Sequence, residues 1–326
     1  SKAEIFDGFE DVTRILITDV NRKESRYLSE FKKYSLEEKF WDLCRLKFGY
    51  IDDEPNLTKL LLGIFLTYVS EKITKEIPKK YKKLNVKSTV IIFLNKLRKI
   101  SEYRNDFENL VSEVYSHIKQ DKYFKNILPE HILELDIFDF PDEKITEWIA
   151  ERICDENFSA KLQDKSIIDI IKLRQENNND NDRLKIEYKV LKYAYNSIKN
   201  TGFNFSGNLH ELIKAYDNEY YWIDTYYRKF YYYYDKLVEK SEKYEKLAKI
   251  IELKYTDDFL NPLNIKFNEL LDYNNLSEEI KLQKNFYKNY VEINKNRIVV
   301  IISDAFRYEV AKELVGKMNK DEKMNA

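Results

Sequence analysis

The scarcity of glycine and proline constrains this fold more than any other feature of the sequence. The 326 residues include only 6 Gly and 5 Pro. Sandwiches, barrels and propellers need many tight turns, and those turns depend on these two residues. Hydrophobic residues make up 43% of the chain, enough for a core beneath a surface rich in charge. We therefore predict a mainly α-helical protein, and the length predicts about two domains.

The spacing of apolar residues and the positions of helix-capping and helix-ending residues predict where the helices lie. Segments with helical periodicity recur from residue 9 onward, among them 9–31 and 87–99. A stripe at steps of three and four marks one long helix over 209–237. We expect Gly49 to end the helix over 36–48, and Asn56 or Thr58 to begin the next. Ser206 or Asn208 is expected to cap the long helix, and Asn261-Pro262 to break the following one. Polar loops at 177–182 and 201–207 give a sub-boundary near 177–207.

The pattern changes near the end of the sequence. Ile298–Ile302 is a β-branched run typical of a strand buried on both faces. A helix is expected over 306–318. We therefore predict a helical region over 1–295 and the first β-α unit of an α/β domain over 296–326. Because Ser1 is not Met and the sequence stops after one such unit, we expect a fragment of a longer protein. We expect the strand to dock on the helices or to pair with a second copy.

Charge and cysteine content exclude several classes of protein. Lys and Arg total 56 against 57 Asp and Glu, so the chain lacks the basic excess of a dedicated nucleic-acid binder. Two distant cysteines make no disulfide framework, which favours a reducing cytoplasm. The most apolar stretch, residues 60–69, is too short to cross a bilayer. We expect a cytoplasmic protein with no membrane partner.

Charge is unevenly distributed along the chain. Residues 72–99 hold ten basic residues and one acid, whereas 102–156 hold fifteen acids and six basic residues. Within the basic segment, Lys79, Lys80, Lys82 and Lys83 form a dense run. That run is either a solvated face, an intramolecular partner of the acidic segment, or a contact for DNA. The tyrosines of 216–234 have the same ambiguity, since tyrosine fills cores and also stacks on bases.

The usual catalytic motifs are missing from the sequence. Gly202 and Gly207 have P-loop spacing, but no Lys-Ser/Thr pair follows them. The three histidines are scattered, and HExxH does not occur. Asp304 stands out because it follows the predicted strand, where open α/β sheets bind ligands. A carboxylate at that position could hold a divalent metal, or Ser303 or Asp304 could cap the following helix.

The run from Ile298 to Ala311, with Ser303-Asp304-Ala305-Phe306-Arg307-Tyr308-Glu309 at its centre, resembles the opening of the PglZ domain. That domain belongs to the alkaline-phosphatase-like metalloenzymes and occurs in the phage-resistance systems called BREX. Softer resemblances to the type A PglZ proteins extend upstream, at 40–50, 221–231 and 286–287.

The resemblance implies a metal-dependent phosphatase or phosphodiesterase with Zn, Mn or Mg. It implies that Asp304 is one metal ligand, that Arg307 and Glu309 support the site, and that the nucleophile and other ligands lie beyond residue 326. We expect this chain to bind no metal alone, to be catalytically incomplete, and to act as a scaffold for other phage-defence proteins. The alternative is a DNA-binding module that uses 72–99 or the tyrosine-rich helix. A strand-mediated dimer is also expected.

Overall fold

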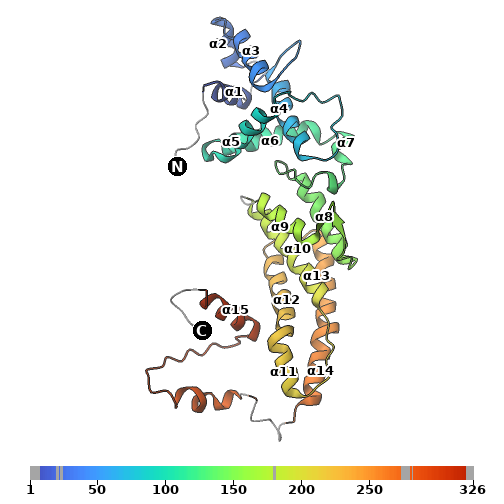
Figure 1. Cartoon of the computed structure of the whole chain (residues 1–326), viewed down its shortest axis with the longest axis vertical. Coiled ribbons are helices and arrows are strands. Elements are labelled where there is room, and N and C mark those ends of the chain that lie inside the picture. The colour runs from blue at the N-terminus through green and yellow to red at the C-terminus, as the bar shows by residue number, and fades with distance from the viewer. Residues whose placement is uncertain are drawn as a thin grey trace. The chain divides into compact units, whose positions relative to one another are not determined.

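The structure, a computed structural model, describes residues 8–19, 22, 25–178, 181–272, 280 and 282–320. It is mainly helical, as predicted, and divides into two compact units at Ile145/Thr146, inside one helix (Figure 1). No boundary was predicted at this position. The division predicted at 295/296 remains a prediction.

The first unit is a group of helices around a core of aromatic and aliphatic side chains. Its helices are α1 (Gly8–Thr18), α2 (Arg26–Lys33), α3 (Glu37–Phe48), α4 (Leu57–Lys72), α5 (Lys87–Lys99), α6 (Arg104–Ile118), α7 (Lys122–Lys125) and the start of α8 (Phe140–Cys154). Helix α4 lies at the centre, since nearly every residue from Leu60 to Val69 is buried. The apolar stretch of the sequence is thus a core helix.

Local signals set the ends of these helices. Asn56 caps α4 by accepting the Lys59 N–H at 2.9 Å. Gly49 ends α3 in the left-handed conformation, with φ of 69°, and so turns the chain sharply after the helix. Both predictions are confirmed. The predicted helix over 9–31 is wrong, because α1 ends at Thr18 and α2 starts at Arg26.

The second unit contains a long helical bundle. After the end of α8, a short antiparallel hairpin of β1 (Lys161–Leu162) and β2 (Lys165–Ser166) leads into α9 (Ile167–Asn177). The bundle continues with α10 (Asp182–Asn200), α11 (Leu209–Ala215), α12 (Tyr221–Tyr234), α13 (Glu242–Leu253) and α14 (Asn261–Leu270). Helix α12 packs along α10, and Figure 1 shows α11 and α12 in line with each other.

Two π-helical turns join helices in this bundle. Tyr216–Tyr220 links α11 to α12, and Lys254–Leu260 links α13 to α14. The long helix predicted over 209–237 therefore exists, with Asn208 as its cap, but it contains a π turn and ends at Tyr234. The break predicted at Asn261-Pro262 is wrong. Proline is tolerated in the first turn of a helix, and here it lies at the start of α14.

The predicted strand over Ile298–Ile302 does not form. These residues are 36–90% exposed, and the sheet of the described residues contains only β1 and β2. A strand needs a neighbour to accept and donate its backbone hydrogen bonds, and this segment has none in the described chain. The expected docking of this segment on the helices is therefore wrong, and the alternative, pairing with a second copy, stays a prediction. The helix after it is confirmed as α15 (Tyr308–Met318). Among the described residues, no helix is long and apolar enough to cross a bilayer.

Candidate functional site

Asp304 lies on an exposed turn before α15. Its Oδ1 accepts the N–H of Ala305 at 2.9 Å, and Ala305 has a positive φ of 52°. Helix α15 begins at Tyr308 with Arg307 as its N-cap residue, so neither Ser303 nor Asp304 caps this helix. The carboxylate is thus free to face a ligand with its second oxygen.

The three residues of the predicted metal motif have different environments. Arg307 is exposed, and its carbonyl accepts the N–H groups of Val310 and Ala311 at 3.1 and 3.0 Å. Glu309 is buried at 2% exposure. Potential metal ligands do not gather in groups of three or more anywhere in the described part of the chain. Asp304 therefore provides one donor here, and one carboxylate does not make a metal centre.

Glu309 instead contacts the helical bundle. Its Oε1 lies 3.5 Å from Nε of Arg228 on α12, and Arg228 also donates from Nη2 to Glu313 at 2.9 Å. Lys229 adds a second ion pair to Glu313 at 3.2 Å. Arg228, with help from Lys229, lowers the pKa of Glu313 to about 2. These ion pairs attach α15 to α12, directly after the Asp304 turn.

Aromatic contacts complete the attachment of α15. The Tyr308 ring lies 5.7 Å from that of Tyr216 and 6.0 Å from that of Tyr221, centroid to centroid. A groove of about 420 Å³ lies between α12 and α15, and Arg228, Lys229, Glu313 and Lys317 are among its lining residues. The structure thus joins the predicted motif to the tyrosine-rich helix, a link that the sequence analysis did not predict.

Four tyrosines on α12 and on the π turns of the bundle have hydrogen-bond partners. Tyr216 and Tyr255 both donate their hydroxyls to Asp224, the latter at 2.6 Å. Tyr227 and Tyr231 both donate to Glu252, at 2.7 and 2.8 Å. Burial and the Glu252 carboxylate raise the pKa of Tyr227 to about 12. This pattern favours the packing interpretation over base stacking for these four tyrosines.

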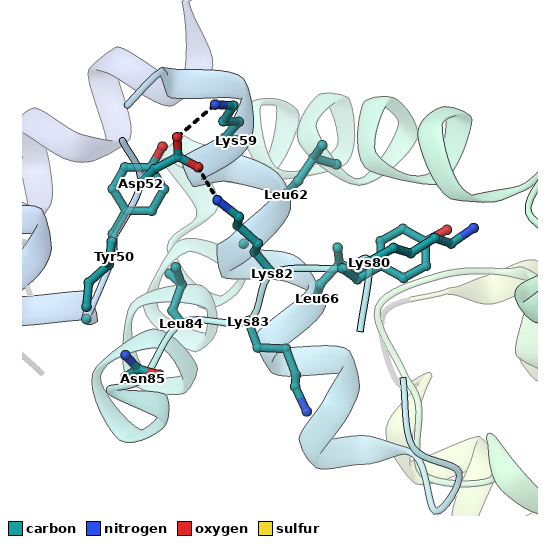
Figure 2. A pocket seen from close by; sticks show the side chains of 14 residues that line it. Tyr50, Asp52, Lys59, Leu62, Leu66, Lys80, Lys82, Lys83, Leu84 and Asn85 are labelled. Atoms are coloured by element: carbon teal, nitrogen blue, oxygen red, sulfur yellow. Dashed lines mark hydrogen bonds and ion pairs between the residues drawn. The ribbon is translucent and has the colours of Figure 1, made fainter. Parts of the chain in front are cut away.

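The basic run lies beside a pocket in the first unit (Figure 2). The pocket has a volume of about 410 Å³ and lies between α4 and the loop at 79–85. Lys80, Lys82 and Lys83 line it, whereas Lys79 does not. The structure therefore brings three of the four predicted lysines together at one site.

A carboxylate that the sequence analysis missed organises this pocket. Asp52 has a side chain only 3% exposed, and it pairs with Lys59 at 2.8 Å and Lys82 at 2.9 Å. Figure 2 shows it between the two amines. Hydrogen bonds from Lys59 and then Lys82 hold the pKa of Asp52 well below its usual range. Asp52 is 30 residues from Lys82 in the sequence, so no local motif could reveal the pair.

Other basic residues of 72–99 also pair with acids of the same unit. Lys80 pairs with Asp121, and Arg98 with Asp136 at 2.6 Å. Both acids belong to the acidic segment at 102–156, which supports the intramolecular interpretation of the two charged segments. Lys79 and Lys83 have no ion-pair partner among the described residues.

Comparison with known proteins shows that the chain is similar to alkaline phosphatase-like proteins. The chain is 29% identical over 331 aligned positions, covering 97% of its length, to the alkaline phosphatase-like protein PglZ of Bacillus cereus. It is 23% identical over 348 positions to the alkaline phosphatase-like protein BrxZ of Escherichia coli, again over 97% of its length. The chain spans only 38% and 40% of these two relatives. No protein-family model matches the chain, and no solved structure does.

Proposed function

The chain is a PglZ-type, alkaline-phosphatase-like sequence over 97% of its length, and on that premise we propose that it is the helical support of a metal-dependent phosphohydrolase of phage defence. The similarity along nearly the whole chain is the observation that carries this proposal. It covers both helical units, so these helices are a shared part of such proteins.

In this proposal, α12 holds the start of the phosphatase-like domain in place. The ion pairs of Arg228 with Glu309 and Glu313 support this role, because they connect the bundle to the helix that follows Asp304. Asp304 would act as one ligand of a divalent Zn, Mn or Mg ion, which could polarise a phosphoryl oxygen. Its exposed carboxylate has an oxygen free for this purpose. The other ligands would come from the remaining three-fifths of such a protein, so this chain alone would be inactive.

The scaffold role would include docking other phage-defence proteins. Direct DNA binding is less well supported, because Lys80, Lys82, Arg98 and the paired tyrosines already have partners inside the molecule. A nucleic-acid site needs several free cations along the phosphate backbone.

Activity assays on a protein of the relatives' full length test the enzymatic proposal. We would measure hydrolysis of p-nitrophenyl phosphate and bis(p-nitrophenyl) phosphate with Mn, Mg or Zn. Asp304→Ala should abolish the metal-dependent rate, and the 326-residue chain should show none. Asp258→Ala, which removes a carboxylate from an exposed part of the bundle, is the matched control and should leave the rate unchanged. An Asp304→Ala variant as active as the unmodified protein would refute the ligand role.

A further inference from the structure

The pocket beside Asp52 combines an apolar interior with a basic rim. Leu62 and Leu66 of α4 and Leu84 of the loop provide the apolar side chains, with Lys59, Lys80, Lys82 and Lys83 around them (Figure 2). Its volume of about 410 Å³ falls within the range of ligand-binding pockets. None of these residues takes part in the α12–α15 contact.

The pocket is held open by backbone anchoring of the loop. The Leu84 N–H donates to Oγ1 of Thr67 at 2.7 Å, and the Val86 N–H donates to the Phe48 carbonyl at 3.2 Å. Gly63 lets the loop lie close to α4, since a Cβ there would fall 2.9 Å from Cδ2 of Leu84. The occupant would therefore meet a preformed surface, which reduces the entropic cost of binding.

The charges of the rim are only partly compensated. Asp52 pairs with both Lys59 and Lys82, and Asp121 pairs with Lys80. Lys83 has no carboxylate partner among the described residues, and in Figure 2 its amine points away from Asp52. Four lysines against two carboxylates thus leave an excess of two positive charges beside an apolar interior, too little charge for a run of phosphates.

The apolar surface continues out of the pocket. Ile51 lines it and is 64% exposed, so an occupant would contact apolar surface both inside and at the mouth. A peptide that inserts one side chain into the pocket and lies across its rim fits this surface better than a small enclosed ligand does.

We infer that this pocket docks a short acidic peptide segment of a partner protein, with one large apolar side chain inserted and Asp or Glu beside Lys83. Charge complementarity and the apolar interior together select this occupant. The inference deepens the docking role proposed above and rests on it, but it needs neither a metal nor hydrolysis.

The test uses the full chain and fluorescein-labelled nine-residue peptides. Each peptide carries Leu, Ile, Phe or Trp at the centre and Asp or Glu elsewhere. Control peptides carry Ser at the centre, or Asn and Gln in place of the acids. Fluorescence anisotropy at physiological salt should show binding of at least one acidic apolar peptide, about tenfold tighter than its Ser control.

Matched variants locate the site. Lys83→Glu and Ile51→Asp should each weaken binding about tenfold, whereas Lys79→Glu, an exposed change in the same run but outside the pocket, should have less than about a twofold effect. Circular dichroism checks that each variant is folded.

Three results would overturn the inference. One is that no acidic apolar peptide binds with a Kd below about 1 mM. Another is that Lys79→Glu weakens binding as much as Lys83→Glu, which would indicate general charge attraction. The third is that a single-stranded oligonucleotide binds more tightly than every peptide and loses affinity in Lys83→Glu. The activity assay above is independent of these results, so the failure of one proposal can be told from the failure of the other.

Discussion

Glu309 on α15 lies with its Oε1 3.5 Å from Nε of Arg228 on α12, and neither atom has a hydrogen-bond partner. Glu309 is 2% exposed, whereas the Arg228 side chain is 30% exposed and also pairs with Glu313. A buried carboxylate is costly unless an opposite charge compensates it. The charge of Arg228 is therefore what compensates the buried Glu309 carboxylate where α15 meets α12.

Removing the Glu309 charge should loosen α15. Breaking a buried ion pair costs several kcal/mol, and the partial exposure of Arg228 reduces this to about 1–2 kcal/mol for Glu309→Gln. Amide hydrogen exchange over residues 308–318 should then accelerate roughly 5- to 30-fold. Lys317→Gln is the control, because Lys317 is 73% exposed and, among the residues that the structure describes, forms an ion pair only with Glu313. Equal exchange in both variants would contradict this prediction.

The attachment of α15 should also depend on pH. Arg228 and Lys229 lower the pKa of Glu313 from 4.5 to about 2. The stabilisation by Glu313 is therefore fully present above pH ~4.5 and is lost as the pH falls toward 2. Hydrogen exchange of α15 should be constant from about pH 7 to 5, after correction for intrinsic rates, and should rise below that. In Glu313→Gln, this acid-dependent rise should shrink.

Gly49 should not tolerate a side chain. Its φ of 69° is unfavourable for other residues, and a Cβ would lie 2.9 Å from the backbone nitrogens of Asn85 and Val86. Gly49→Ala should destabilise the first unit by about 1–3 kcal/mol, seen as faster hydrogen exchange in α3 and α5. Gly202→Ala provides the comparison, since nothing lies within 4 Å of its Cβ position. Its exchange pattern should match that of the unmodified chain.

Neutralising Asp52 should strengthen the binding of acidic peptides. Asp52→Asn releases Lys59 and Lys82 from their shared partner, which adds positive charge at the pocket rim. We expect affinity for the acidic apolar peptide to rise ~threefold. Asp53→Asn makes the same change in net charge at an exposed neighbour outside the pocket, so it should have a smaller effect. A loss of affinity in folded Asp52→Asn would count against the proposed peptide site.

Local signals in the sequence predicted much of the helical structure. Helix α5 matches its predicted range of 87–99, and the caps at Asn56 and Asn208 and the stop at Gly49 are all present. Each of these features depends on residues close together in the chain. The hairpin at 161–166 was missed, because strands of two residues have no periodicity to detect.

Long-range relationships could not be predicted in the same way. The sequence indicated a dense basic run, but the partners that neutralise it, Asp52 and Asp121, lie 30 and 41 residues from Lys82 and Lys80. The β-branched residues of 298–302 predicted a strand, yet a strand depends on a neighbour that composition cannot supply. The burial of Glu309 was also unforeseen, since it results from contact with Arg228, which is distant in the sequence.

The π turn at Tyr216–Tyr220 links the number of residues before α12 to the direction in which the side chains of α12 point. A π turn accommodates about one residue more than an α turn, and one residue corresponds to a rotation of roughly 100° about the helix axis. Deleting one residue there would turn the whole outer face of α12, including Arg228, away from its present direction while changing no side chain. The direction in which the α15-binding surface of α12 faces thus depends on the number of residues in this turn. Closely related chains should conserve that number even where the individual tyrosines vary.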